Sequence, residues 1–500
     1  MKVHLMFPDR DFNLEAKPLA NEVDLVQDLE MEALFAAMAA GDEFLGKVAQ
    51  RAIPDGLSNS RKIVLWRQAV LQDCLANEET IRLLYGMTLE AAQIRKGMFL
   101  PFISSHPNIM LSDGRRLLEG LHGVLCNLSA FAKQNLSLFR SEGLRNLCEM
   151  LIADLSPGYL EEMNQHLATL HFRFGLLFSA RLGWGNEGVD FVPRYFAPER
   201  WAWLKELLGN APPHYRFSLD PRDESGAREL SELQDAVLVD MAQITASASS
   251  HVEAFFTMLR TELAFYIGCL NLRHQLVSRN TPICIPEMIT EGCSLRFEDL
   301  RDASLTLTLT GNVIGNDLDA LETPLIMITG ANQGGKSTFL RSIGLAQMMM
   351  QAGMFVTARA FAADLRDGVF THYRRREDKG LNSGKFDEEL RRMNQIVGQI
   401  GHAPLFLFNE SFAATNEREG AEVARQIITA LAEAGGRVVF VTHMYALAEA
   451  FDGKGPIPVF FLLAERTEDG RRSFRILPGK PQDTSFGRDL YRQIFHDVAV

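Results

Sequence analysis

The chain lacks the cysteine spacings that mark a disulfide framework or a zinc site. It has six cysteines in 500 residues, and no two of them form a C-x-x-C pair. Because they are scattered, we expect them to be reduced residues of the hydrophobic core, without a metal or disulfide role. They are Cys74, Cys126, Cys148, Cys269, Cys284 and Cys293.

Long apolar runs are also missing. No stretch approaches the roughly 20 consecutive apolar residues that span a bilayer. The first residues, MKVHLMFPDRD, lack a positive segment followed by an apolar one, which is the pattern of a secretory signal. We therefore expect a cytosolic (cytoplasmic) protein without a membrane partner.

The sequence has no excess of positive charge. Its net charge is −12, with 47% hydrophobic and 23% charged residues, which is ordinary for a globular chain of several domains. Any contact with DNA must therefore use a local basic patch. The densest basic run is HYRRR at 372–376, although a solvated or dimer-facing loop explains that run equally well.

Glycine and proline are absent from Ala227 to Ile267. Apolar residues recur there every three or four positions, which predicts one long helix over 227–270. At 1.5 Å per residue such a helix would measure on the order of 60 Å. It could serve as a lever between distant sites or as an ordinary helix of a bundle.

The remaining patterns divide the chain into three parts. Residues 1–20 form a short arm, and residues 21–280 are mostly helical, with a glycine- and proline-rich interruption at 180–225. We interpret that interruption as a connecting subdomain in preference to a ligand pocket. From 281 to 500, short apolar runs alternate with helical segments, which predicts an α/β domain with a mostly parallel sheet. The predicted strands are Leu325–Thr329, Leu405–Phe408, Val438–Thr442 and Val459–Leu463.

The first of these strands leads into a phosphate-binding motif. Gly330 to Ser337 reads GANQGGKS, which fits G-x-x-x-x-G-K-[ST] between a strand and a helix. Lys336 supplies a positive charge for the β- and γ-phosphates of ATP, and Ser337 a hydroxyl for Mg²⁺. The residues expected to hold the nucleotide are Gly330, Ala331, Asn332, Gln333, Gly334, Gly335, Lys336, Ser337 and Thr338.

Polar residues follow two other predicted strands. Asn409 and Glu410 end the run PLFLFNE, where such enzymes carry a magnesium-organising residue and a general base. Glu410 is the expected base, while Asn409 is a weaker metal ligand than a carboxylate. His443 directly follows the strand ending at Thr442 and is the expected sensor of the γ-phosphate.

These motifs make residues 281–495 resemble the ATPase half of the MutS family of DNA mismatch-repair proteins. The segment from Ile328 to Ala358 is similar to that family's phosphate loop and helix. DKGLNSGKFDEE at 378–389 stands where the family carries its S-T-F-x-x-E signature loop. FNESFAATNEREG and VVFVTHMYALAEAF resemble the family's later ATPase motifs, and TSFG at 484–487 resembles its C-terminal motif. The helical half is similar more weakly, and its long helix resembles the family's lever.

The resemblance implies an ABC-type P-loop ATPase that binds ATP and Mg²⁺ and acts on DNA as a homodimer. Each ATP site would be composite, with the phosphate loop of one subunit facing the signature loop of the other. Ser383 and Gly384 would then contact the partner's nucleotide, Ser337 and Asn409 would hold the metal, and Glu410 and His443 would be catalytic. ATP binding would move the lever helices around DNA.

The sequence also departs from the family pattern. Asn409 replaces an aspartate, and Gly384 replaces the signature serine. The F-x-E wedge of mismatch readers occurs only at 386–388 and 408–410, inside the ATPase half. We therefore expect no mismatch-reading domain, and at most a reduced clamp within 180–225.

Two functions are compatible with these residues. The first is an ATP-switched dimer that binds mismatched, branched or otherwise structured DNA and hydrolyses ATP slowly. The alternative is an ATP-binding dimeric interaction protein that has nearly lost hydrolysis and has a protein partner. Glu410, His443 and the complete phosphate loop favour the first function, whereas Asn409 and Gly384 favour the second.

Overall fold

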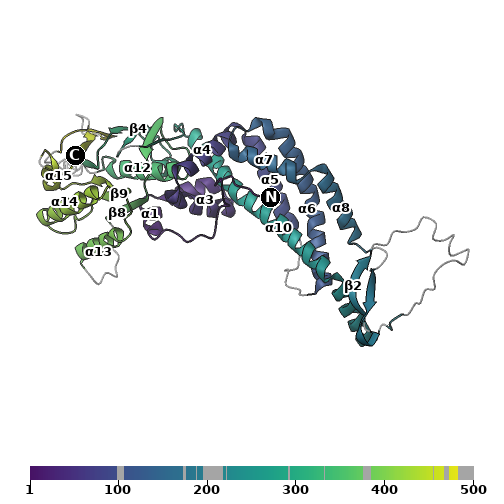
Figure 1. Ribbon diagram of the computed structural model, residues 1–500. Coiled ribbons are helices and arrows are strands. Elements are labelled where there is room, and N and C mark those ends of the chain that lie inside the picture. The colour runs from purple at the N-terminus through teal and green to yellow at the C-terminus, as the bar shows by residue number, and fades with distance from the viewer. Residues whose placement is uncertain are drawn as a thin grey trace, which may run out of the picture. The chain divides into compact units, whose positions relative to one another are not determined.

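A computed structural model describes most of the chain (Figure 1). The described residues are 1–97, 106–172, 176–186, 188–194, 218–220, 222–290, 293–330, 333–374, 384–453, 455–466 and 472–481. Internal contacts divide the chain into two compact units. The first contains residues 1–3, 82–139 and 145–260, and the second contains 4–81, 140–144 and 261–500. The domain limits at residues 20 and 280 rest on sequence patterns and stay a prediction.

The first unit is mainly helical, as the apolar spacing indicates. Its helices are most of α5 (Glu78–Lys96), α6 (Pro107–Asn135), most of α7 (Glu142–Asp154), α8 (Pro157–Thr169) and the first part of α10. The apolar residues that recur every three or four positions on α6 are buried, at Leu117, Leu121, Val124, Leu128 and Phe131. An antiparallel hairpin of β1 (Leu177–Leu182) and β2 (Gly188–Arg194) begins just before the predicted interruption at 180–225 and extends into it.

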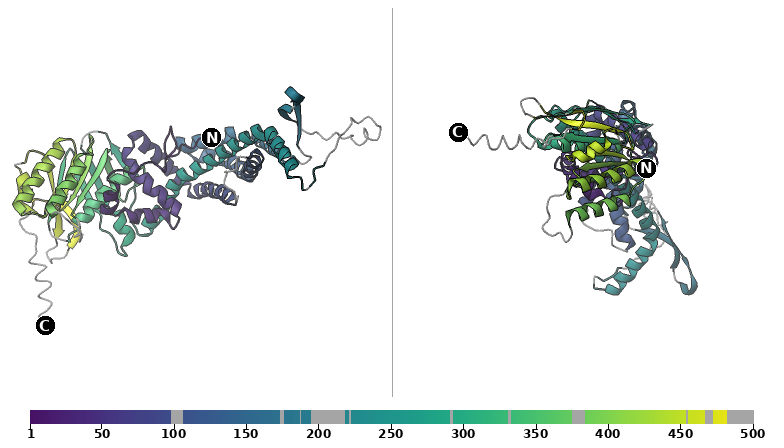
Figure 2. Two further views of the ribbon diagram at one scale, coloured as in Figure 1. Left: turned by 90° about the horizontal axis from the view of Figure 1, so that it is seen from below. Right: turned by 90° about the vertical axis from the view of Figure 1, so that its left-hand side faces the viewer.

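Helix α10 (Glu224–Ser278) confirms the predicted long helix and extends it at both ends. Its 55 residues correspond to about 80 Å at 1.5 Å per residue. The helix continues through Gly268 to Ser278. A Cβ atom at Gly268 would come within 3.0 Å of the Met38 side chain. The glycine therefore allows close helix packing at that point. Figure 2 shows α10 in two further views.

The second unit is built on a six-stranded sheet with the order β12-β11-β6-β10-β9-β8. The strands from β11 to β8 are parallel and β12 is antiparallel, which confirms the mostly parallel sheet. All four predicted runs are strands of it. The bounds are β6 (Leu325–Gly330), β8 (Gly368–Tyr373), β9 (Pro404–Asn409), β10 (Arg437–Val441), β11 (Val459–Arg466) and β12 (Arg472–Pro478).

Helices cover both faces of this sheet, so its central strands are buried without alternation. A Cβ atom on Gly344 of α12 (Lys336–Gln351) would touch Leu407, so α12 packs on the Leu407 face of β9. Phe406 and Phe408 point to the opposite face and join a core with residues of α14 (Glu417–Glu433) and α15 (Tyr445–Phe451). Helix α13 (Lys385–Val397) contacts β8.

A second, smaller sheet has the order β3-β7-β4-β5 and mixes parallel and antiparallel pairs. Its strands are β3 (Glu287–Ile289), β4 (Leu295–Leu300), β5 (Asn316–Ala320) and β7 (Ala360–Asp364). The short helix α11 (Ala303–Thr308) connects β4 toward β5. Helices α1 (Glu22–Asp28), α2 (Met31–Ala39), α3 (Glu43–Asp55) and α4 (Arg61–Ala76) complete the unit.

The segment from Leu5 to Phe12 is fixed by a buried carboxylate of α10. Glu262 is 0% exposed and accepts hydrogen bonds from the backbone N–H groups of Leu5, Met6 and Phe12 at 2.6, 3.1 and 2.8 Å. Tyr266, one turn later, donates its hydroxyl to Leu5 O at 2.8 Å. Burial raises the pKa of Glu262 to about 7, and the three N–H groups oppose that rise. This part of the arm is therefore an integral piece of the second unit.

Two further observations concern the whole described chain. No helix among its described residues is both long and apolar enough to cross a membrane. All six cysteines are free, but only Cys74, Cys148 and Cys269 are buried. The expectation of core positions was wrong for the other three, which are partly exposed.

Candidate functional site

The phosphate loop has the predicted strand–loop–helix geometry. It leaves β6 at Gly330, whose φ is +108°, and enters α12 after Gly335, whose φ is +89°. Both angles lie in the region that favours glycine. Lys336, at the first position of α12, is only 5% exposed and donates from Nζ to Gly330 O at 2.9 Å. Ala331 and Asn332 lie outside the described residues.

The two residues predicted to hold the metal meet at one end of this loop. The Ser337 hydroxyl donates to Asn409 Oδ1 at 2.9 Å, although the two residues are 72 positions apart in sequence. Both offer neutral oxygen atoms, which Mg²⁺ accepts as ligands beside phosphate oxygens and water. The described residues contain no group of three or more His, Cys, Asp or Glu that could hold a metal. The pair thus fits a Mg²⁺ ion that arrives with a phosphate ligand.

Glu410 and His443 lie together at the same edge of the sheet. His443 Nδ1 is 3.9 Å from Glu410 Oε1, and Arg374 Nη1 is 4.0 Å from Glu410 Oε2. Glu410 has a φ of +55° and donates its backbone N–H to Val441 O at 2.9 Å. The Glu410 carboxylate is partly exposed, so it can accept a proton from water, and it lies close to the Arg374 guanidinium.

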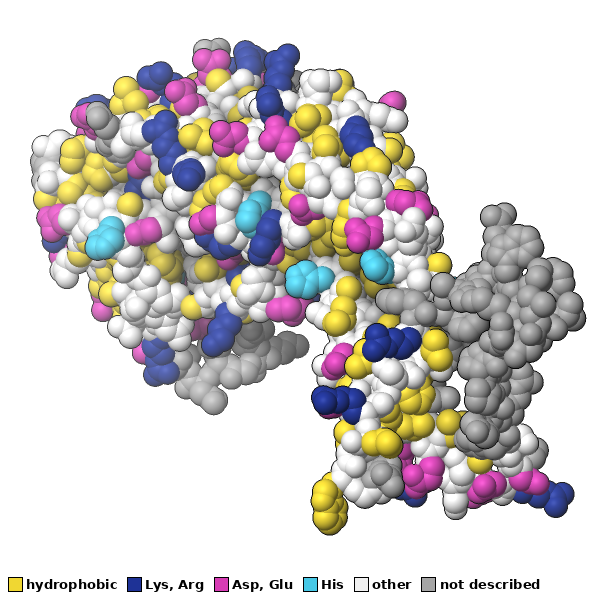
Figure 3. Space-filling view, turned by 45° about the vertical axis from the view of Figure 1, so that its right-hand side comes forward, with side chains coloured by type: hydrophobic (Ala, Val, Ile, Leu, Met, Phe, Trp, Pro, Cys, Tyr) yellow, Lys and Arg dark blue, Asp and Glu magenta, His cyan; other side chains and the backbone are white. Residues whose placement is uncertain are grey.

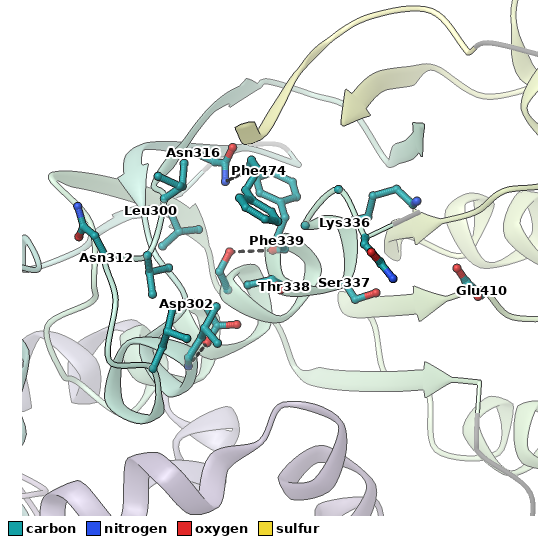
Figure 4. A pocket seen from close by; sticks show the side chains of 18 of the residues that line it. Leu300, Asp302, Asn312, Asn316, Lys336, Ser337, Thr338, Phe339, Glu410 and Phe474 are labelled. Atoms are coloured by element: carbon teal, nitrogen blue, oxygen red, sulfur yellow. Dashed lines mark hydrogen bonds between the residues drawn. The ribbon is translucent and has the colours of Figure 1, made fainter. Parts of the chain in front are cut away.

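These groups line one cavity of about 700 Å³ (Figure 4). Its polar end is formed by residues 333–338 together with Arg374, Glu410 and His443. Its other end is largely apolar and was not predicted from sequence. That end is lined by Leu300, Leu305, Leu309, Val313, Ile314, Phe339 and Phe474, with Asn312 and Asn316 among them.

Phe474 is the most prominent residue of the apolar end. It is 50% exposed, has a φ of +59°, and lies beside Gly335. Asn316 holds its strand in place by accepting from Ile476 N at 2.7 Å and donating to Phe474 O at 3.5 Å. A half-exposed ring at an apolar wall can stack on a flat aromatic ligand. The only sequence signal for this role is an aromatic residue flanked by Ser473 and Arg475 at the start of an apolar run.

Positive charge gathers around the loop. Arg472 donates from Nη1 to Gln333 Oε1 at 2.8 Å, next to the phosphate loop. Burial, together with Arg472, lowers the pKa of Lys336, and Glu410 opposes the shift. A bound anion would remove this penalty, so the polar end is suited to phosphate.

The described residues of the basic run, 372–374, do not form one exposed patch. His372, the first residue of this run, is 0% exposed and therefore contributes to neither a DNA-binding patch nor a solvated loop. Arg374 lines the cavity, and 375–376 lie outside the described residues. Gly384 is the N-cap of α13 and is not among the cavity's lining residues. Its action on a partner's nucleotide stays a prediction, and Ser383 lies outside the described residues.

Comparison with protein families agrees with this geometry. Residues 326–491 match the family model described as MutS domain V, and residues 59–279 match that of the MutS2 N-terminal domain. The chain belongs to the MutS family. The domain V match starts in β6 and covers the phosphate loop, Asn409, Glu410, His443 and Phe474. The other match covers α4 through to the end of α10.

Individual MutS-family relatives cover much of the chain. The DNA mismatch repair protein MutS of Methanosarcina mazei is 28% identical over 87% of this chain and 47% of its own length. The protein of the same name from Desulforamulus reducens is 25% identical over 81% of this chain and 45% of its own. The Endonuclease MutS2 of Lacticaseibacillus casei is 30% identical over 43% of this chain and 27% of its own. The chain thus spans about half the length, or less, of the curated relatives it matches.

Proposed function

We propose that the chain is an ATP-switched, DNA-binding member of the MutS family that works as a dimer and hydrolyses ATP slowly. One observation supports this most directly: Lys336, Ser337, Asn409, Glu410 and His443 line or adjoin a single cavity. Membership of a family of DNA-acting ATPases supports the DNA part of the proposal. Mismatched, branched or otherwise structured duplex is the expected DNA class.

Each end of the cavity has a separate task in ATP binding. The N-terminal end of α12, the loop glycines and Lys336 would bind the β- and γ-phosphates. The adenine would lie in the apolar end, where Phe474 offers a ring face. Ser337 and Asn409 would hold Mg²⁺, which supplies charge stabilisation to the phosphates when bound.

The hydrolysis step uses the two residues beside the phosphate end. Glu410 would take a proton from the attacking water, and His443 would donate a hydrogen bond to the γ-phosphate. Asn409 contributes no negative charge to the metal, which supports slow turnover. In the dimer, Ser383 and Gly384 of one subunit would reach the nucleotide of the other.

The face of the molecule seen in Figure 3 does not present one obvious DNA-binding patch. Figure 3 shows Lys and Arg interspersed with Asp and Glu over the face in view. The F-x-E pattern occurs in this chain only inside the ATPase half, so the chain supplies no such aromatic wedge to stack on a mispaired base. We expect binding of this chain to follow the charge of the duplex backbone, to fall steeply with salt, and to discriminate weakly against a single mismatch.

The deciding experiment measures steady-state ATP hydrolysis of the whole chain without DNA and with perfect, mismatched and branched duplexes at one salt concentration. We expect Mg²⁺-dependent turnover that changes when DNA is added, and an ATP-dependent shift to a dimer in sedimentation. ATP binding without turnover and without a DNA response would favour the alternative, an ATP-binding interaction protein whose partner is another protein.

A further inference from the structure

The turn that carries the proposed base is held in an unusual backbone conformation. Glu410 and Phe412 have φ values of +55° and +64°, and neither is a glycine. Side chains rarely adopt this region, and such residues persist only where surrounding contacts fix them. The residue between them, Ser411, is 0% exposed. The question is which contacts fix the turn.

His372 of β8 makes most of those contacts. Its Nδ1 lies 2.8 Å from Ser411 Oγ, and its own carbonyl oxygen lies 2.5 Å from the same hydroxyl. Its ring also stacks on Phe412, with centroids 5.3 Å apart and planes 16° from parallel. Both acceptors for the single hydroxyl hydrogen of Ser411 therefore belong to His372.

The same ring contacts helix α13. His372 Nε2 lies 3.1 Å from Glu389 O, and a carbonyl can only accept, so Nε2 carries the hydrogen. Burial lowers the pKa of His372 to about 4, so the ring is neutral near pH 7 and Nδ1 carries no hydrogen. The Ser411 hydroxyl therefore shares its single hydrogen between His372 O and His372 Nδ1. The Glu389 side chain in turn accepts a hydrogen bond from the Phe412 backbone. Helix α13 is thus connected to the turn in two ways: through the His372 ring, and through the hydrogen bond between the Glu389 side chain and the Phe412 backbone.

We propose that His372 and Ser411 are positioning residues for Glu410. Together they hold the turn after β9 so that the Glu410 carboxylate faces the cavity beside His443, and they transmit any displacement of α13 to that carboxylate. The inference rests on the proposed function, because it concerns the base of that reaction. Neither residue lines the cavity, so neither contacts the nucleotide.

The test uses Ser411→Ala, which removes the hydroxyl and leaves the His372 ring in place. We expect kcat for ATP to fall about tenfold to a hundredfold, the scale for a small misplacement of a catalytic group. The dissociation constant for ATP should stay within about twofold, because the phosphate loop and apolar end are unchanged. Thr371→Val is the matched control: it removes a buried hydroxyl on the same strand that has no hydrogen-bond partner among the described residues, so kcat should be retained.

A second variant separates positioning from general loss of packing. His372→Phe keeps an aromatic ring against Phe412 but removes both ring hydrogen bonds. If the two residues act through one bond, the double variant should lose no more kcat than the more damaging single variant. Multiplying effects on kcat, or equal losses in kcat and ATP affinity, would show independent structural roles and overturn the inference.

The outcomes also separate this inference from the proposed function. If the unmodified chain shows no ATP turnover under any DNA condition, the proposed function fails and the positioning role fails with it. If the unmodified chain turns over and Ser411→Ala does so at the same rate, only the positioning role is wrong.

Discussion

Two turns at the carboxyl edge of one sheet carry the residues of the proposed chemistry. Both contain residues with positive φ, but different kinds of residue and contact stabilise them. The phosphate loop after β6 places glycines, Gly330 and Gly335, at two of its three described positive-φ positions, and Gln333 at the third has a φ of +61°. The turn after β9 places Glu410 and Phe412 at such positions and relies on His372 and Ser411 to hold them. The first solution is local in sequence, whereas the second depends on contacts with another strand. The backbone conformation at a catalytic position can thus depend on tertiary contacts that no local sequence motif predicts.

The largest effect is expected at the turn. Glu410→Gln keeps the shape of the side chain but removes its ability to take a proton, so kcat should fall at least ~10²-fold. ATP should still bind, because the phosphate loop is intact. Quench-flow or steady-state kinetics measures this, with Glu433→Gln on the exposed end of α14 as control. Turnover equal to that of the unmodified chain would show that Glu410 is not the base.

A substitution in the phosphate loop should change the affinity for ATP more than the rate of hydrolysis. Lys336→Ala removes a charge-assisted contact to phosphate worth about 1.5–3 kcal/mol, so ATP affinity should drop about tenfold or more. Calorimetric titration with ATP measures the change, and Lys47→Ala, an exposed lysine away from the cavity, is the control. An unchanged affinity would contradict the phosphate-loop assignment.

A third variant tests the glycine solution itself. Gly335→Ala meets only ordinary contacts near the new Cβ, the closest at 3.5 Å, so its cost comes from the backbone at φ +89°. The free energy of unfolding should fall by about 1–2 kcal/mol. Gly384→Ala is the matched control, since its φ is −63° and its Cβ would meet nothing within 4 Å. Urea denaturation should show a loss of about 0.5 kcal/mol for the control, because alanine is a poorer N-cap than glycine; equal losses would mean that the conformation is not the cause.

The smallest effect is expected at the metal. Asn409→Asp adds a negative charge beside Mg²⁺ with almost no change in shape, so half-maximal turnover should need a few-fold less Mg²⁺ and the rate should rise. A Mg²⁺ titration of both forms measures this. An aspartate variant that works no better would favour the function as an ATP-binding interaction protein.

The sequence predicted the parallel sheet, the long helix and the polar end of the cavity, because each rests on a local pattern. The apolar end escaped prediction, since β4, β5 and α11 are short and their strands alternate charged with buried residues. The position of Phe474 depends on a hydrogen bond from Asn316, which is 158 positions away in sequence. His372 lies in a basic run, and the sequence alone does not indicate its contacts with Ser411 and Phe412. In both cases a tertiary contact, invisible in sequence spacing, determines the role.

The buried carboxylate of Glu262 also has a consequence for the time course of synthesis. Leu5, Met6 and Phe12 precede it by 257, 256 and 250 positions. A ribosome adding about 5–20 residues per second needs roughly 12–50 s to cover that interval. During that interval the hydrophobic residues of this segment lack their native partners on α10. The second unit can complete its folding only after the end of α10 has been synthesised.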